Sequence, residues 1–235
     1  MRAKINETSM TLNGVDRAQR QRTYVTLGTR RGGTSMVAGI IRALGVDLGR
    51  IGALKHNEDP EFQNKAIADM REAITRRNTE RDVWGWKFPA AGSYLPVLVK
   101  SIRNPFFIVV FRDPVAAAMS QLRKDRDVSR RSPRVSLHES NANANTNTGF
   151  AMATTRPCLV VSFEKAKDKP HALIDELADF LFVEHPDDEL RSRILDYSSP
   201  GQYKTFDDFF GSGGSADGDG RVRDLLGQGQ TRSVT

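Results

Sequence analysis

A short apolar segment near the start of the chain runs directly into a glycine-rich loop and then into a helical pattern. The apolar segment is TYVTL (23–27), the loop is GTRRGG (28–33), and Gly45 supplies the stop after the helix. Between loop and stop, apolar residues recur at helical spacing: Met36, Val37, Ile40, Ile41 and Leu44. In a strand–loop–helix unit of this kind, backbone N–H groups converge on a phosphate or sulfate. The segment therefore predicts an anion-binding unit.

Further apolar segments alternate with helical patterns. VWGW (83–86), FFIVVF (106–111) and CLVVSF (158–163) are predicted strands. The second is apolar throughout, which is typical of a parallel strand covered on both faces. Strands alternating with helices predict the fold class α/β, with a doubly wound parallel sheet in a P-loop NTPase-like three-layer sandwich.

Pairs of Asp and Pro indicate where two of the helices begin. Asp59 with Pro60 opens a helix that is predicted to run to about residue 78, and Asp113 with Pro114 opens another. The first helix has an apolar stripe of Phe62, Ile67, Met70 and Ile74. A later helix presents Leu173, Leu177, Phe180 and Leu181 on one face.

Composition predicts one folded domain with loose ends. Residues 1–22 are polar and unpatterned and are predicted to form a flexible N-terminal arm, and residues 23–210 are predicted to form the α/β domain. Within it, SNANANTNTG (140–149) is predicted to be a low-complexity loop that is too polar to bury. The glycine-rich segment 211–235 is predicted to be a flexible tail.

Charge and cysteine usage narrow the functional classes. The net charge is +6, from 35 Lys and Arg against 29 Asp and Glu, which suits an anionic partner. The single cysteine, Cys158, excludes an intramolecular disulfide and a multi-cysteine zinc site, and its apolar strand predicts a buried thiol. We expect no membrane span and a cytoplasmic protein. The basic segment 123–134 has no interleaved aromatic residues, so we expect no nucleic-acid partner; it lines a cleft for an anionic acceptor or forms a solvated helix end.

The loop departs from a nucleotide triphosphatase in one respect. Gly28 and Gly33 have the P-loop spacing G-x-x-x-x-G, but the lysine expected next is Thr34, followed by Ser35. The positive charge lies inside the loop instead, at Arg30 and Arg31. A P-loop kinase or hydrolase is therefore the less favoured alternative.

The segment GTRRGGTSMVAGIIRALGV resembles the 5′-phosphosulfate loop of sulfotransferases that use 3′-phosphoadenosine-5′-phosphosulfate (PAPS). The segment FFIVVFRDPVAAAMSQLR is similar to the family's 3′-phosphate element, in which Arg ends a strand and Ser follows eight residues later. Weaker likenesses in VWGWKFP and in CLVVSFEKAKDKPHALIDELADFLFV extend the resemblance over about residues 23–183. It implies that PAPS is bound by Arg30, Arg31, Gly32, Gly33, Thr34, Ser35, Arg112 and Ser120.

This resemblance implies transfer of a sulfuryl group from PAPS to a hydroxyl or amine acceptor, such as a carbohydrate or small metabolite. Adenosine 3′,5′-bisphosphate (PAP) is the product, and no metal is required. The chain departs from the family pattern at Arg30, where the loop usually has Pro, and at Met36, often an aromatic residue that stacks on adenine. The C-terminal Arg-Lys-Gly element is absent. A non-catalytic protein that binds PAP or PAPS is therefore an alternative.

Candidate catalytic residues are Arg31, His56, Glu58 and Lys87. Arg31 matches the family's catalytic cation and is suited to stabilising negative charge in the transition state, since arginine is a poor proton donor. His56 and Glu58 are alternative general bases for the acceptor hydroxyl, or else a loop residue and part of a helix start. The sequence favours His56 as the base, because Glu58 lies next to Asp59 at a predicted helix start and has a structural use there. Lys87 contacts the sulfonate or an acidic acceptor, or is a solvated residue at a strand end.

Overall fold

The computed structural model describes residues 4–14, 18–51, 56–124, 132–199 and 205–210. Its strands are β1 (Lys4–Ile5), β2 (Ser9–Leu12), β3 (Arg22–Gly28), β4 (Val83–Lys87), β5 (Pro105–Phe111) and β6 (Cys158–Ser162). Its α-helices are α1 (Thr34–Ala43), α2 (Ile67–Glu80), α3 (Leu95–Leu98), α4 (Pro114–Lys124), α5 (Pro133–Ala153), α6 (Phe163–Asp168), α7 (Pro170–Leu181), α8 (Asp188–Ser198) and α9 (Phe206–Phe210). Short 3₁₀ helices are η1 (Pro60–Phe62), η2 (Ala91–Ser93) and η3 (Val99–Ser101).

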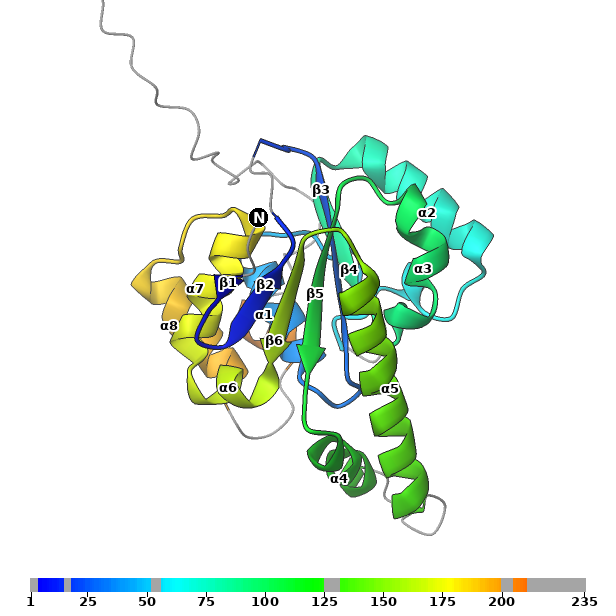
Figure 1. Ribbon diagram of the computed structural model, residues 1–235. Helices are drawn as coiled ribbons and strands as arrows, with labels where there is room; N and C mark the ends of the chain where they lie inside the picture. Colours follow the sequence, from blue (N-terminus) through cyan, green and yellow to red (C-terminus); the bar gives the residue numbers. More distant parts are fainter. Residues whose placement is uncertain (1–3, 15–17, 52–55, 125–131, 200–204, 211–235) are drawn as a thin grey trace, which may run out of the picture.

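The strands form one sheet in the order β1-β2-β6-β5-β3-β4. Neighbours among β4, β3, β5 and β6 are parallel, whereas β2 is antiparallel to both β6 and β1. Helices cover both faces (Figure 1): α1, α6, α7 and α8 lie on one side of the sheet, and α2, α3 and α5 on the other. The predicted α/β sandwich is confirmed, with β1 and β2 as an antiparallel addition at one edge.

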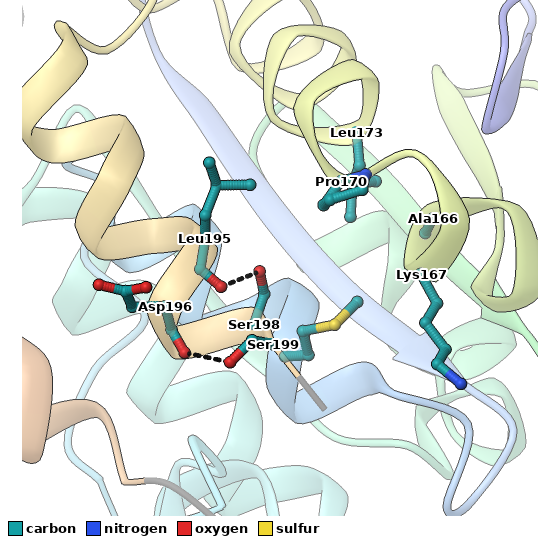
Figure 2. Close-up of a pocket in the computed structure, with 9 residues that line it drawn as sticks. Ala166, Lys167, Pro170, Leu173, Leu195, Asp196, Ser198 and Ser199 are labelled. Atoms are coloured by element: carbon teal, nitrogen blue, oxygen red, sulfur yellow. Dashed lines mark hydrogen bonds between the residues drawn. The ribbon is translucent and has the colours of Figure 1, made fainter. Parts of the chain in front are cut away.

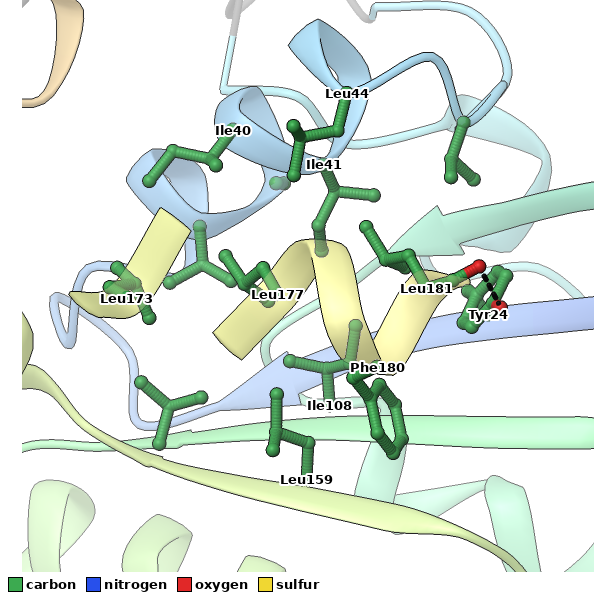
Figure 3. Close-up of a cluster of buried hydrophobic side chains, with 14 of the residues drawn as sticks. Tyr24, Ile40, Ile41, Leu44, Ile108, Leu159, Leu173, Leu177, Phe180 and Leu181 are labelled. Atoms are coloured by element: carbon green, nitrogen blue, oxygen red, sulfur yellow. Dashed lines mark hydrogen bonds between the residues drawn. The ribbon is translucent and has the colours of Figure 1, made fainter. Parts of the chain in front are cut away.

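Side chains of β3 alternate between two hydrophobic clusters, one on each face of the sheet. Tyr24 belongs to the cluster that α1 and α7 cover, and Val25 and Leu27 belong to the cluster under α2 and α3. In the first cluster the Tyr24 hydroxyl donates to the Leu181 carbonyl at 2.8 Å (Figure 3). Cys158 is buried in the second, as predicted, and burial raises the pKa of its thiol to about 12.

The described part of residues 1–22 does not form the flexible arm that the sequence predicts. It contains β1 and β2, which extend the sheet beyond β6. The Glu176 carboxylate of α7 holds the turn between them: it accepts from the N–H groups of Glu7 (2.8 Å) and Thr8 (3.0 Å) and from the hydroxyls of Thr8 and Ser9 (both 2.6 Å). Because these contacts are polar, the sequence has no hydrophobic pattern that would predict β1 and β2.

The predicted loop 140–149 is wrong, because these residues lie inside α5. Ser132 caps this helix by accepting from the Arg134 N–H at 3.2 Å, and Pro133 occupies its first position. Ser136, Ser140 and Asn147 lie along its buried side. The segment is helical although it is polar, since its buried stripe consists of small polar side chains at helical spacing.

The helix predicted from Asp59 to about residue 78 is interrupted. Asp59 does act as a cap, accepting from the Glu61 N–H at 3.0 Å, but only the 3₁₀ helix η1 follows it. Asn64 has a left-handed φ of 54°, and α2 begins at Ile67. The predicted apolar stripe still packs into the core under α2, with Ile67 only partly buried.

Residues 211–235, predicted to form a flexible tail, lie outside the described residues, as do 125–131 of the basic segment 123–134. Among the helices that the structure describes, none is long and apolar enough to cross a membrane.

Candidate functional site

The loop between β3 and α1 lies where the strand order of the sheet reverses. β3 has β4 on one side and β5 on the other, all three parallel, so their carboxyl ends meet at this edge. Open α/β sheets bind ligands at such a reversal. The topology therefore brings together the predicted residues that follow these strands: the 28–35 loop, Lys87 and Arg112.

Glycine is required at both ends of the loop. At Gly28 a Cβ would lie 2.1 Å from the Val110 carbonyl oxygen, so only glycine allows β3 to approach β5 so closely. Gly33 has a φ of 82°, and a Cβ there would lie 2.2 Å from the Phe163 ring. Arg31 is also left-handed, with a φ of 60°. Left-handed residues in a loop turn successive N–H groups toward one side and form a concave anion site.

The start of α1 carries no side-chain cap. Its N-cap residue is Gly33, which makes no side-chain hydrogen bond, and the first turn contains no acidic residue. The first N–H groups of a helix need a partner, and the helix dipole makes a negative charge favourable there. This helix end is chemically suited to a phosphate or sulfate group.

Arg112 leaves the end of β5 and contacts the loop directly. Its Nη1 donates to the Arg31 carbonyl at 2.6 Å, and its guanidinium lies 4.9 Å from the centre of the Phe163 ring. Its Nε is buried and has no partner within the described residues. Burial lowers the pKa of Arg112, an effect that the Glu164 carboxylate opposes and the Arg31 guanidinium reinforces. Two arginines are thus held close together at the edge of the sheet.

Ser120, predicted to act with Arg112, lies about two turns into α4 and is half-buried. Within the described part of the chain the structure gives its hydroxyl no hydrogen bond, and none joins it to Arg112. Its predicted role in phosphate binding remains a prediction.

Lys87 connects several of the predicted residues. Its side chain is 1% exposed, and its Nζ donates to Ser35 Oγ at 3.1 Å, to the His56 carbonyl at 3.0 Å and to Glu58 Oε1 at 2.8 Å. Burial lowers the pKa of Lys87, and the neighbouring Glu58 carboxylate raises it in opposition. The structure therefore brings Ser35, His56, Glu58 and Lys87 into one cluster beside the first turn of α1.

The segment that carries His56 and Glu58 is fixed on both sides. The Asn57 amide donates to the Ser35 carbonyl at 3.0 Å and to the Tyr197 hydroxyl at 3.1 Å. On the other side of Glu58, the buried Asp59 carboxylate pairs with Arg77. Burial raises the pKa of Asp59, and Arg77 opposes this shift. The Glu58 side chain is 17% exposed, so its carboxylate is held in place and is still reachable.

A pocket of about 280 Å³ adjoins α1 on the face covered by α6, α7 and α8 (Figure 2). Met36 lines it from α1, Leu173 from α7 and Leu195 from α8. Lys167 and Asp196 add charges at its walls. The pocket is mainly apolar and begins three residues after Gly33, at the residue that the sequence places beside adenine.

Sequence reasoning missed two residues of this site. Phe163 packs against Gly33 and beneath Arg112, and Asn143 Oδ1 of α5 accepts from the Arg30 N–H at 3.0 Å. Phe163 was assigned to the end of a strand and Asn143 to a loop. Only the helical spacing of Asn143 and Asn147, which lies one turn later, could have indicated that this face of α5 is buried.

No protein-family model matches the chain, and no curated protein matches it. Solved structures do share its fold. Sulfotransferase STF9 from Mycobacterium avium is 10% identical, with a TM-score of 0.50 over 76% of this chain and 68% of that chain. Retinol dehydratase in complex with androsterone and inactive cofactor PAP is 15% identical, with a TM-score of 0.50 over 86% of this chain and 73% of that chain. The protein has a sulfotransferase-like fold, as predicted.

Proposed function

We propose that this protein is a sulfotransferase that moves the sulfuryl group of PAPS to an acceptor hydroxyl. One observation carries the proposal: the uncapped helix start at Gly33 and the guanidinium of Arg112 lie together at the reversal of strand order. The helix start suits a 5′-phosphosulfate and the guanidinium suits a 3′-phosphate. The sulfotransferase-like fold supports this assignment.

The residues present fit such a donor. Gly33 leaves the start of α1 without a side chain and without a cap, and the Nε of Arg112 has no hydrogen-bond partner within the described residues. We assign the 5′ end of the nucleotide to Arg30, Arg31, Gly32, Gly33, Thr34 and Ser35, and the 3′-phosphate to Arg112 and Ser120. We place adenine in the 280 Å³ pocket beside Met36, whose thioether is polarisable and packs well against aromatic rings.

The donor, when bound, supplies the sulfuryl group, and the protein's residues supply charge and orientation. Arg31 stabilises the negative charge that grows on the oxygen bridging sulfur and phosphorus, together with the N–H groups of the loop. Arg31 has a left-handed backbone, and its carbonyl accepts a hydrogen bond from Arg112. Both features fix this part of the loop before the reaction begins. Preorganised charge of this kind needs no rearrangement during transfer.

Glu58 is the better placed of the two candidate bases. Its carboxylate pairs with Lys87, which also binds Ser35 at the start of α1, so it is held at the edge of the phosphosulfate loop. His56 contributes its backbone carbonyl to the same cluster. We therefore assign Glu58 the removal of the acceptor proton and Lys87 the positioning of Glu58. The acceptor is a hydroxyl-bearing small molecule or carbohydrate.

A transfer assay with radiolabelled PAPS and a panel of sugar and small-molecule alcohols tests this function. Glu58→Gln keeps an oxygen for Lys87 but cannot take a proton, so we expect turnover to fall by about 100-fold or more while PAP affinity is unchanged. His56→Ala, the matched variant, should retain turnover. Wild-type turnover in Glu58→Gln would contradict the assignment of the base. PAP binding without transfer to any acceptor would instead indicate a non-catalytic binding protein.

A further inference from the structure

A pocket of about 570 Å³ lies between α3 and α5. These two helices lie on the opposite face of the sheet from α1, which carries Met36 (Figure 1). Its volume falls in the range of small-molecule sites, about 300–1,000 Å³. One end lies at Gly92, which follows β4, and the other at Lys100 and Arg156, which precede β5 and β6. The pocket thus runs along the sheet from the edge that carries the phosphosulfate loop toward the opposite edge.

Gly149 borders this pocket at an exposed position. It lies inside α5 and lines the pocket, and a Cβ built on it would meet nothing within 4 Å. Glycine inside a helix costs about 1 kcal/mol relative to alanine. Its backbone here is helical, and no neighbour requires the missing side chain. A larger side chain at this position would therefore extend into the open space beside the pocket.

The pocket has both apolar and positively charged lining residues. Val99 and Phe150 provide apolar walls, and Lys100 and Arg156 bring positive charge to the end that lies near the starts of β5 and β6. Both residues are exposed, and within the described part of the chain neither pairs with a carboxylate. The Asn13 amide donates to the Thr154 and Arg156 carbonyls, both at 2.9 Å, so the backbone that carries Arg156 is fixed.

We propose that this pocket binds an amphipathic carboxylate, with its apolar chain against Val99 and Phe150 and its carboxylate between Lys100 and Arg156. A guanidinium matches the two oxygens of a carboxylate, and an ammonium adds a second positive charge. The apolar walls select against small hydrophilic anions. This site is independent of the proposed sulfuryl transfer, because binding alone defines it.

Calorimetry of the full chain with decanoate, in the presence of saturating PAP, tests the charged end. We expect decanoate to bind with a Kd below about 1 mM and decan-1-ol to bind at least 10-fold more weakly. The double variant Lys100→Met/Arg156→Met should weaken decanoate binding at least 10-fold and leave decanol binding unchanged. Arg71→Met, which removes an exposed positive charge from α2, serves as the matched control and should have no effect.

Gly149→Leu tests the location of the site. Its side chain enters open space, so we expect decanoate and decanol binding to be lost while resistance to urea stays the same or rises. Decanoate binding to Gly149→Leu with wild-type affinity would overturn the proposal, since the ligand would then lie elsewhere. Absence of decanoate binding to the wild type, or equal affinity for decanoate and decanol, would overturn it as well. Loss of PAP binding would bear only on the sulfotransferase proposal.

Discussion

Helices α1 and α4 begin at the same edge of the sheet, each after a central parallel strand, yet they begin in opposite ways. At α4 the Asp113 carboxylate accepts from the Ala116 N–H at 2.7 Å and brings a negative charge to the helix end. At α1 the corresponding position is Gly33, which provides no side chain. The difference indicates that α4 satisfies its own helix end, whereas α1 presents its end to an external anion.

The charged side chains near the two helix starts also differ in sign. Carboxylates gather at the start of α4, where Glu164 accepts from the Asp113 N–H at 3.0 Å. The loop before α1 instead carries Arg30 and Arg31. Arg112 contacts the loop before α1, because it donates a hydrogen bond to the Arg31 carbonyl. The comparison therefore predicts that substitutions around α1 affect ligand binding and catalysis, and that those around α4 affect stability.

The largest expected effect is on catalysis at the loop before α1. Arg31→Ala should lower kcat by about 10²–10³-fold, because it removes a group that meets charge developing in the transition state. PAP affinity should change only a few-fold, as steady-state kinetics and calorimetry would show. Arg71→Ala, which removes an exposed positive charge from α2, is the control. Equal losses in kcat and PAP affinity would indicate that Arg31 binds the ground state instead.

Arg112→Ala should separate two ligands. We expect PAP binding to weaken by about 1.5–3 kcal/mol, because a charge-assisted hydrogen bond to the 3′-phosphate is lost. Adenosine 5′-phosphosulfate, which lacks that phosphate, should weaken far less in a parallel titration. If both ligands weakened to the same extent, Arg112 would be acting through the loop conformation.

A pair of glycine substitutions, one at each end of α1, tests whether the start of this helix binds the ligand. Gly33 and Gly45 flank this helix and have φ values of 82° and 94°. Alanine at either costs about 1–2 kcal/mol of folding free energy through its left-handed backbone. Only at Gly33 does the new Cβ meet a neighbour, the Phe163 ring at 2.2 Å. We therefore expect Gly33→Ala to be the less stable variant in urea and to lose PAP binding, with Gly45→Ala retaining it. Retained PAP binding in Gly33→Ala would argue against anion binding at the uncapped start of α1.

The smallest effect belongs to α4. Asp113→Ala removes the cap and should lower the free energy of unfolding by about 1 kcal/mol, measured in urea. PAP affinity should not fall, since Asp113 caps its own helix and repels phosphate. A large loss of PAP affinity would break the division between the two helices.

The central fold can be predicted from the sequence because its strands are short segments rich in apolar and β-branched residues, of which β5 is apolar throughout. β2 and α5 could not be predicted in the same way. β2 is anchored by the Glu176 carboxylate, and α5 buries Ser140 and Asn147, so neither gives a hydrophobic signal. Of the candidate site, the glycine-rich loop and Arg112 could be predicted from their motifs, whereas Phe163, which follows β6, belongs to no such motif and joins the site by packing against Gly33 and Arg112.

Titration calorimetry of the wild-type chain with PAP and, separately, with ATP and magnesium tests the central claim most directly. The loop before α1 and Arg112 suit phosphates at both ends of one nucleoside, and the P-loop lysine is replaced by Thr34. We therefore predict that PAP binds at least 10-fold more tightly than ATP with magnesium. Equal or tighter binding of ATP with magnesium would contradict the account.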